Sequence, residues 1–450
     1  MFKVKLKKFI KRACPLIFYL FIACIPIQTV KVFKDAKLNG NTWEYGKMMI
    51  YGTDILIFLL IIFFTLEIWL LKKKRGQVLE NIKKTSFLWF FVVLSFVFIF
   101  LAIEKELALY NSIKILEFAL LFLFIVSHKI SFKRLSFSLF FGVLFEIVFS
   151  FWQFFNQYSP AIKLLGMSVY HPYIPGRATI LVANRLYLRT YGTMPHPNVL
   201  GGYLVIVLFF LLALLFSLFN QKKPNVLARL FLSIIYFLAL FNLFITFSRA
   251  VLGVFLMGLF VFFFWLYKKK PGFSSFARQI FVMSLLLISL FIFLFSGLFF
   301  ARFDSSSAQY QSSNIERGEG YNIAIELFEK RGLTGVGAGN FTLAHYKLIN
   351  DTLDAWVYQP AHNIYLLVLV EHGILASVFF GIFLVRILIR FFKKIKSKLL
   401  ESEWFVAVGL SLVAVLLISL VDHYFWTLQP GRILFWVVLG LVWRFGIMKK

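Results

Sequence analysis

Residues 198–219 read NVLGGYLVIVLFFLLALLFSLF, a stretch without a charged side chain. A helix of about 20 apolar residues crosses the hydrocarbon core of a bilayer, which is about 30 Å thick. The stretch therefore predicts a membrane-spanning helix. Similar segments flank it on both sides and bring the predicted number of spans to twelve, at residues 12–30, 51–71, 86–103, 110–127, 135–156, 198–219, 229–247, 250–267, 280–299, 373–392, 403–424 and 431–446.

The composition of the whole chain agrees with this prediction. Of its 450 residues, 60% are hydrophobic and 15% are charged. Soluble domains contain about 45–50% apolar and about 25% charged residues. So few polar residues cannot cover soluble domains of this size, and the apolar excess also excludes a disordered chain. The predicted fold class is an all-α integral membrane protein with about 12 transmembrane helices.

The formal net charge of +28 would suit a nucleic-acid-binding protein, but the positions of the charges favour another explanation. Lys and Arg concentrate in the cytoplasmic connections of membrane proteins. With the N-terminus in the cytoplasm, most of the 48 Lys and Arg fall on that side. The prediction is a multi-pass protein of the cytoplasmic membrane with both termini cytoplasmic, a lipid bilayer as partner and no nucleic acid. The predicted cytoplasmic segments are 1–12, 72–85, 128–134, 220–229, 268–279, 386–402 and 444–450.

Two long segments on the outward side carry most of the chain outside the membrane. The cytoplasmic connections are too short for a strand–helix–strand unit of about 30 residues, which argues against an ATPase, a kinase or an enzyme of nucleotide-sugars. We therefore expect any chemistry at the outer face. In the second long segment, the spacing of Tyr321, Ala324, Ile325 and Phe328 predicts an amphipathic helix. The predicted organisation is 1–156, the first five membrane helices; 157–197, a first outward loop; 198–299, four further helices; 300–362, a large outward loop with short helices; and 363–450, a short helix and the last three spans.

Arginines on the outward side are candidates for binding an anion. Arg189 lies in the first outward loop, Arg249 in a tight turn between two spans, and Arg317 in the large loop. A guanidinium group presents paired donors that fit phosphate oxygens. An interfacial arginine can instead extend to lipid headgroups, and both explanations stay open for each residue. Arg249 is the strongest candidate, because a cation at an outward turn runs against the usual charge distribution.

Two segments at helix entries contain further candidates. In RTYGTMPHPN, residues 189–198, Gly192 and the prolines shape the approach and Asn198 is expected to cap the helix that follows. In QPAHNIYLLVLVEHG, residues 359–373, Asn363 is expected to cap a helix and Gly373 to stop or bend it. His362 precedes the positive end of that helix, which favours a neutral ring suited to a base. A single loop histidine is more often structural or solvated, so both roles stay open.

The sequence predicts no metal and no cofactor. It contains no Asp-x-Asp, no His-x-x-x-His and no cysteine cluster, and its two cysteines are expected to pack inside a helix. Asp351 and Asp354 could share a helix face, although a solvated face is the simpler explanation. Glu117 and Glu146 fall near the middle of predicted spans. A transport function and a protonated, hydrogen-bonded carboxyl explain such residues equally well.

At these motifs the sequence resembles the O-antigen ligase and polymerase superfamily, polytopic glycosyltransferases with a GT-C-like fold. Over residues 186–375 the order and the predicted side of the motifs match the family pattern. The first five helices match only as hydrophobic segments. The motifs are Arg189, Gly192 and Pro197–Asn198; Ser248–Arg249; Arg317, Gly335 and Gly337; His362–Asn363; and Glu371-His-Gly373.

The resemblance implies a function and a set of roles. The protein would transfer or polymerise an undecaprenyl-pyrophosphate-linked glycan onto the hydroxyl of a glycan, lipid or protein acceptor during assembly of surface polysaccharide. Arg189 and Arg249 would bind the donor pyrophosphate, with Arg317 as a supporting cation. His362 would lie at the acceptor, as base or orienting residue. Further substrate-binding positions would be Asn198, Gly192, Ser248, Asn363 and Glu371.

Two other classes of protein remain. The first is a flippase for lipid-linked oligosaccharides or another transporter, which Glu117 and Glu146 would suit. The second is a receptor or scaffold without catalysis. A transporter concentrates polar residues at mid-membrane, whereas this chain places them mainly in outward loops. A scaffold has no use for arginines at outward turns.

Overall fold

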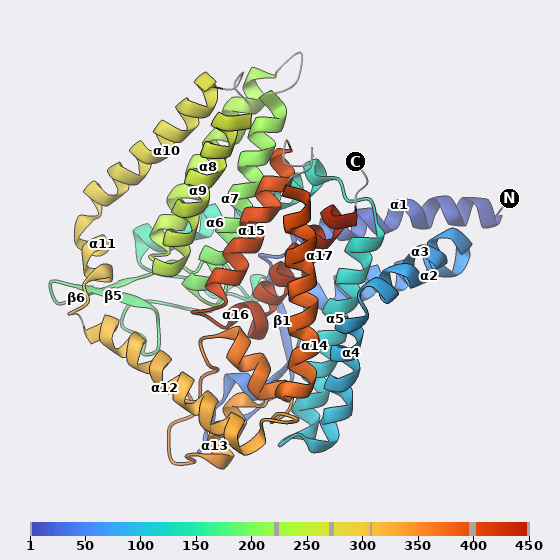
Figure 1. Ribbon diagram of the computed structural model, residues 1–450. Helices are drawn as coiled ribbons and strands as arrows, with labels where there is room; N and C mark the ends of the chain where they lie inside the picture. Colours follow the sequence, from blue (N-terminus) through green and yellow to red (C-terminus); the bar gives the residue numbers. More distant parts are fainter. Residues whose placement is uncertain (1, 220–224, 270–273, 307, 396–401, 448–450) are drawn as a thin grey trace.

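The computed structural model describes residues 2–219, 225–269, 274–306, 308–395 and 402–447, and it is 74% helical (Figure 1). Among these described residues, eight helices are long and apolar enough to cross a membrane. A bent pair turns through 76° and brings the number to nine if it is one span: α3 (Lys72–Lys84) and α4 (Ser86–Val97) with its 3₁₀ extension to Leu101. The eight are α2 (Gly52–Leu70), α5 (Lys105–Ser127), α6 (Phe132–Asn156), α7 (Pro197–Phe219), α8 (Val226–Ile245), α9 (Arg249–Lys269), α10 (Ser274–Leu294) and α14 (Ile364–Ile395).

The prediction of an all-α membrane protein is confirmed, while the number of twelve spans stays a prediction. Three further helices occupy predicted spans without meeting the same length and composition: α1 (Phe2–Ala23), α15 (Glu403–Ile418) and α17 (Gln429–Ile447). Several predicted boundaries differ from the structure, and two of the differences concern helix ends that come early. The first span does not reach residue 30, because the chain turns into a strand there. The eleventh ends at Ile418 rather than 424, before a pair of polar residues.

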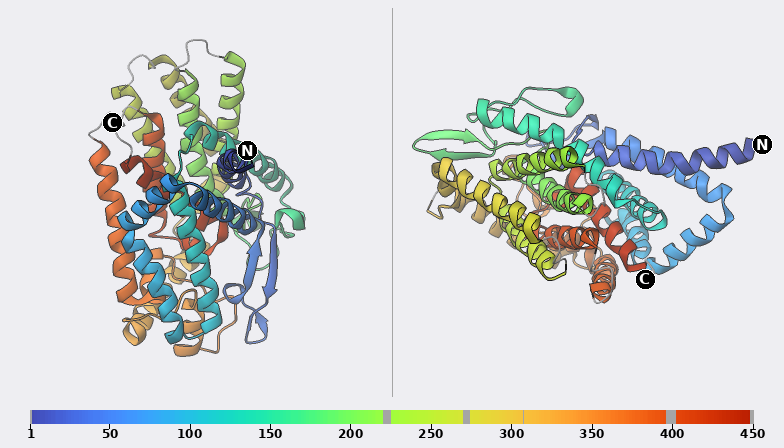
Figure 2. Two further views of the ribbon diagram at one scale, coloured as in Figure 1. Left: turned by 90° about the vertical axis from the view of Figure 1, so that its right-hand side faces the viewer. Right: turned by 90° about the horizontal axis from the view of Figure 1, so that it is seen from above.

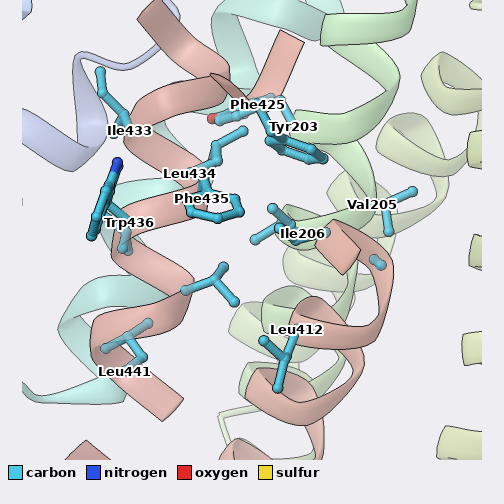
Figure 3. Packing of buried hydrophobic residues seen from close by; sticks show 14 of the residues in the cluster. Tyr203, Val205, Ile206, Leu412, Phe425, Ile433, Leu434, Phe435, Trp436 and Leu441 are labelled. Carbon is cyan, nitrogen blue, oxygen red and sulfur yellow. The ribbon is translucent and has the colours of Figure 1, made fainter. Parts of the chain in front are cut away.

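Helix α7 forms the centre of the molecule. Its apolar residues from Val199 to Phe216 are buried, and none of them is more than 3% exposed. A helix that is apolar on every face belongs inside a bundle, and α7 packs against α6, α8, α9, α15 and α17. Figure 3 shows Tyr203 of α7 near Phe425 and Ile206 opposite Phe435 of α17, with Leu412 of α15 further along the same core.

The helices form two groups that meet at α7 and α17. Helices α8, α9 and α10 lie beside α7 on one side, and α4 (Ser86–Val97), α5 and α14 run together on the other (Figures 1 and 2). The N-terminal part of α1 projects away from this bundle, while the remainder of the helix packs against α2 and α6 (Figure 1). Within the described residues the sheets are three antiparallel hairpins. Their strands are β1 (Val30–Lys34) with β4 (Met48–Tyr51), β2 (Lys37–Leu38) with β3 (Asn41–Thr42), and β5 (Thr179–Val182) with β6 (Arg185–Leu188).

Segments that the sequence places on one side of the membrane lie together. Among the outward segments, Gln28 N–H donates to Leu165 O, Asn39 Nδ2 donates to Asp351 O, and Tyr321 Oη donates to Leu420 O. On the opposite side, Lys74 Nζ donates to the carbonyl oxygen of Ser127. This grouping agrees with the predicted alternation. The predicted cytoplasmic segments 220–229, 268–279, 386–402 and 444–450 fall partly outside the described residues.

The large outward loop contains helices α11 (Ser296–Phe303), α12 (Ala308–Arg331) and α13 (Phe341–Leu348). The expected amphipathic helix at residues 321–330 is the second half of α12. After α12, a glycine-rich turn bonds to α14 where that helix is broken at Gly373. The backbone N–H of residue 336 donates to the carbonyl of 370, that of 337 to 371, and that of 374 to 332, at 2.8–3.0 Å.

Gly373 explains why α14 bends as predicted. Its φ is +66°, in the left-handed region that glycine adopts most readily. A Cβ at this position would lie 2.4 Å from the carbonyl oxygen of Leu333. Only glycine therefore allows the two backbones to approach. We call these bonds between residues 332–337 and 370–375 the glycine clasp.

Candidate active site

Two of the predicted residues, Arg189 and Asn198, meet at the beginning of α7, beside the turn between α8 and α9 and the residues that follow α15. Arg189 donates from Nε to Thr246 O and from Nη2 to Asn198 Oδ1, each at 2.8 Å. Asn198 Nδ2 in turn donates to Asp422 Oδ2 at 2.9 Å. The side chains of Arg189 and Asp422 are buried, with residue exposures of 4% and 8%. A buried cation is thus connected to a buried carboxylate through one amide.

The expected capping role of Asn198 is wrong. Helix α7 begins at Pro197, so Asn198 lies in its first turn. Its side-chain Oδ1 accepts from Arg189, and its side-chain Nδ2 donates to Asp422. The approach to α7 is instead stabilised by His196, whose Nδ1 accepts from the backbone N–H of Asn198 at 3.1 Å. Asn198 therefore positions charged groups rather than the helix end.

Helix α6 holds the loop that carries Arg189. Gln153 Oε1 accepts from the backbone N–H of Tyr191 and Gly192, and its Nε2 donates to Gly192 O at 2.7 Å. Glu146 accepts from the backbone N–H and the hydroxyl of Thr193, at 3.1 and 2.6 Å. Gly192 has a φ of +58°, and a Cβ there would lie 1.8 Å from Glu146 Oε2. Gly192 therefore permits the loop to pack closely against α6. Of the two explanations offered for Glu146, its contacts favour a structural carboxyl that is hydrogen-bonded within the protein.

A positively charged pocket adjoins this loop. Arg249, Arg302 and Arg317 line it together with Ser248, Asn198 and Asp422. A neighbouring open pocket of about 300 Å³ shares Arg249 and Arg317 and is bordered by Phe303. Arg302 Nε donates to Phe247 O at 3.3 Å. Three arginines from two separate stretches of sequence thus line one pocket, and Arg189 lies close enough for the charges of Arg302 and Arg249 to act on it.

The arginines are held in an environment that disfavours their charge. Burial lowers the pKa of Arg189, and the nearby charges of Arg302 and Arg249 lower it further. Burial likewise lowers the pKa of Arg302, helped by Arg249 and Arg317. Like charges that repel each other in a partly dry pocket are stabilised by a bound anion. Phosphate groups match the paired donors of arginine, so the pocket suits a pyrophosphate.

Asp422 is surrounded by three imidazoles. The rings of His362 and His423 are 5.0 Å apart, and His423 Nδ1 lies 2.7 Å from Thr427 Oγ1. Burial raises the pKa of the Asp422 carboxyl, but His423, His362, His196 and the bond from Asn198 outweigh burial, so the pKa is lowered overall. Asp422 is therefore ionised at neutral pH.

His362 is neutral near pH 7, as its position before a helix suggested. Burial lowers its pKa, Arg317 lowers it further, and Asp422 acts in the opposite direction. The main cause is thus burial rather than the helix end that the sequence pointed to. A neutral imidazole beside a carboxylate and across from arginines is suited to accept a proton.

The remaining predicted residues differ in their contacts. Ser248 lines the arginine pocket. Asn363 caps α14 as expected, because its Oδ1 accepts from the backbone N–H of Tyr365 and Leu366 at 2.9 and 3.1 Å. Glu371 is buried inside α14 and accepts from Trp426 Nε1 at 3.3 Å. Asn363 and Glu371 are therefore engaged within the protein and are not among the residues that line either pocket.

Sequence reasoning missed Asp422, His423, His196 and Arg302. Asp422 and His423 fall inside the predicted span 403–424, and Arg302 falls just after the predicted span 280–299, so the sequence pattern assigned all three to apolar segments or their edges. The signal was the pair Asp422–His423 at the end of such a run, since an adjacent acid and imidazole are costly in hydrocarbon.

A second group of potential ligands lies elsewhere among the described residues. Cys14, Glu67 and His128 place ligand atoms within 4.8 Å of one another. Glu67 Oε2 and His128 Nε2 already form a pair at 2.7 Å, and Lys74 Nζ lies 3.4 Å from His128 Nδ1. The lysine disfavours a cation there. These residues belong to α1, α2, α3 and the end of α5, apart from the arginine pocket.

Comparison with known proteins bears on this site. The chain has no match among curated proteins. Residues 234–381 match a family model described as O-antigen ligase. The matched range includes Arg249, Arg317 and His362, whereas Arg189 and Asp422 lie outside it and reach the same site through the fold. The match confirms the resemblance of this region to the O-antigen ligase and polymerase superfamily that the motifs indicated, and it supports an O-antigen ligase-like function in surface polysaccharide assembly.

Proposed function

We propose that this protein is a metal-independent glycosyltransferase of the cytoplasmic membrane. It moves an undecaprenyl-pyrophosphate-linked glycan onto an acceptor hydroxyl at the outer face, with both termini in the cytoplasm. The observation that supports this proposal most is the arginine pocket formed by Arg249, Arg302 and Arg317 directly beside Asp422 and its imidazoles. An anion site next to a neutral base is the arrangement that displacement of a pyrophosphate needs.

The proposed reaction is a direct displacement. The acceptor oxygen forms a bond to the anomeric carbon, and the bond from that carbon to the pyrophosphate oxygen breaks. The electron pair leaves with the lipid pyrophosphate, whose charge the arginines stabilise. The proton of the acceptor hydroxyl passes to the neutral ring of His362 and then to water. We expect inversion at the anomeric carbon.

Transport of a lipid-linked oligosaccharide is the alternative function. The two mid-membrane acids that suggested it have partners within the protein. Glu146 is bonded to Thr193, and Glu117 Oε2 lies 3.4 Å from Lys114 Nζ, which also pairs with Asp54. These contacts favour structural roles for both acids.

Reconstitution separates the two functions. The purified protein is placed in liposomes with lipid-linked glycan extracted from the source membranes and with an acceptor glycan, and the products are identified by mass spectrometry. We expect a glycosylated acceptor together with undecaprenyl pyrophosphate. Movement of the intact lipid between leaflets, without a new glycosidic bond, would instead establish the transporter.

A further inference from the structure

The N-terminal part of the chain completes the imidazole side of the site. The β1–β4 hairpin and the turns inside it, residues 30–51, form an outer segment that lies outside the matched family range. Tyr45 of this segment stands 5.9 Å from His423, ring centre to ring centre, in an edge-to-face arrangement. Its hydroxyl donates to Gln359 Oε1 at 2.8 Å. Gln359 precedes His362 by three residues.

The outer segment is fixed independently of any substrate. Trp43 Nε1 donates to Thr342 Oγ1 at 3.2 Å, and Asn39 Nδ2 donates to the carbonyls of Asp351 and Leu353. A small separate core joins the segment to the large loop and to α5. Its buried members are Leu38, Trp43, Met48, Leu107, Leu343, Ala355 and Tyr358. Packing of the outer segment therefore fixes the position of Tyr45, while the side chain of Tyr45 remains partly exposed.

The direction of attack assigns this side to the acceptor. In an inverting displacement at a sugar carbon, the nucleophile and the leaving group lie on opposite faces of the ring. The arginines mark the face of the leaving pyrophosphate. The attacking hydroxyl must then arrive from the side of His362 and His423. Tyr45 and Gln359 border that side.

The chemistry of the surface formed by Tyr45, Gln359 and the two histidine rings favours one kind of acceptor. Tyr45 and the histidine rings offer aromatic surface. The hydrogen-bonding groups beside it are the phenol of Tyr45 and the amide of Gln359, whose Nε2 also donates to Trp356 O at 2.7 Å. Aromatic surface with a few polar groups is the usual lining of a site for a polar organic ligand. Burial raises the pKa of Tyr45, and Asp422 and Glu44 raise it further. The phenol stays protonated, and both charges that act on it are negative. Lys47, the nearby cation, is paired with Glu44 at 2.9 Å.

We infer that Tyr45 and Gln359 bind the acceptor and select the hydroxyl-rich end of an uncharged glycan over a phosphorylated acceptor. This assignment rests on the proposed glycosyl transfer. It makes residues 30–51 a specificity element that the matched catalytic region lacks.

The test compares Tyr45→Phe and Gln359→Ala with a matched control, Tyr346→Phe. Tyr346 Oη donates to Asn39 Oδ1 at 3.1 Å, so the control removes a hydroxyl that supports the same segment without facing His423. The acceptor probe is the oligosaccharide released by mild acid from the protein's own lipid-linked donor. A phosphorylated copy of that oligosaccharide is the competing probe. Initial rates are measured against each substrate in liposomes.

We expect the acceptor KM to rise about 3- to 10-fold in Tyr45→Phe and in Gln359→Ala, the loss that one hydrogen bond produces. The donor KM should be unchanged in both variants, and Tyr346→Phe should behave like the wild type. The phosphorylated probe should inhibit at least about 10-fold more weakly than the neutral one.

Three results would overturn the inference while leaving the proposed function intact: an unchanged acceptor KM in both variants, an equal rise in Tyr346→Phe, or equal inhibition by the two probes. Absence of any transfer by the wild-type protein would overturn the proposed function, and the inference with it.

Discussion

Arg189 is oriented before any ligand arrives, through its bonds to Thr246 and Asn198. A donor group that is already fixed loses little conformational entropy when it binds an anion. Lysine has neither the second nitrogen nor the planar fork needed to keep both bonds. The site therefore uses the shape of arginine as well as its charge.

Replacement of the arginines should weaken donor binding. We expect Arg189→Ala and Arg249→Ala each to raise the donor Kd by roughly 10- to 100-fold, the range for a lost hydrogen bond to a charged group. Replacement of either arginine by lysine should restore only part of the donor affinity. Arg185→Ala, at an exposed position in β6, is the matched control. Binding of the lipid-linked donor and glycan transfer are the measurements. Wild-type transfer in both alanine variants would contradict the pyrophosphate site.

Removal of His362 should separate chemistry from binding. General-base assistance contributes about 10²–10⁴ in rate, so His362→Ala should lose transfer by that factor and still bind the donor. His171→Ala, at an exposed histidine in the first outward loop, should change neither. Near-normal turnover of His362→Ala would mean that the ring is structural and that the base lies elsewhere.

The pH profile gives a second, independent measure of His362. The ring must be neutral to accept a proton, and its pKa is lowered, so activity should fall only below about pH 6.5, the ordinary value for histidine. Asp422 raises the pKa of His362. Asp422→Asn should therefore move the acidic limb to still lower pH, whereas His362→Ala should abolish it. A limb that stays in place in Asp422→Asn would contradict this coupling.

At the scale of residues, sequence predicted the groups that stand out against their surroundings. Arg249 was found because an arginine at an outward turn contradicts the usual charge distribution, and it does line the pocket. Asp422 and Arg302 were missed because each lies at the edge of an apolar run and contributes through contacts with distant segments. The role of Asn198 was misjudged for a similar reason: capping is a local rule, while its partner Asp422 is 224 positions away.

At the scale of elements, the membrane helices followed closely from the long apolar runs, and the irregular connections did not. The runs that became α5, α6, α7, α8 and α9 agree with the predicted spans to within a few residues at most ends. The hairpins at residues 30–51 and 179–188 gave no comparable signal, since short exposed strands need no alternating apolar face. Their positions depend on tertiary contacts such as that of Trp43 with Thr342.

The glycine clasp should be sensitive to a single methyl group. Gly373→Ala forces an alanine to a φ of +66° and its Cβ to 2.4 Å from a carbonyl oxygen, so we expect the melting temperature to fall by several degrees. Gly381→Ala lies in the same helix, and its Cβ would meet no atom within 4 Å. That control should be neutral or slightly stabilising. Thermal unfolding of the purified proteins in detergent provides the comparison, and equal melting temperatures would contradict the role of the clasp.

At the scale of the whole molecule, orientation is directly measurable. The native Cys14 and Cys24 are replaced, and a single cysteine is introduced at Ser306 between α11 and α12 or at Gly76 in α3. A membrane-impermeant thiol reagent added to whole cells should label position 306 and not position 76. Permeabilised cells should show labelling at both positions. Labelling of 76 alone in whole cells would reverse the orientation and place the arginine pocket in the cytoplasm.

The purified enzyme should remain active in EDTA, because the leaving group is already activated and the arginines supply the positive charge. Loss of activity on chelation, with recovery on addition of Mg²⁺ or Mn²⁺, would contradict a metal-independent reaction. Asp351 and Asp354 at the outer face would then be tested first. The Cys14, Glu67 and His128 group would be tested next, with Cys14→Ser as the discriminating variant.

The glycine clasp also bears on how substrates reach the site. It ties one end of the large outward loop to α14, so this end is not free to swing open like a hinged lid. The polyprenyl tail of the proposed donor would stay in the bilayer throughout. We therefore expect the donor to slide in sideways between helices, with only its sugar head passing beneath α12, while the finished glycan departs toward the solvent. The donor would then enter through the membrane and the glycan product would leave through the aqueous side. The lipid pyrophosphate could therefore diffuse away in the bilayer before the glycan has left the enzyme.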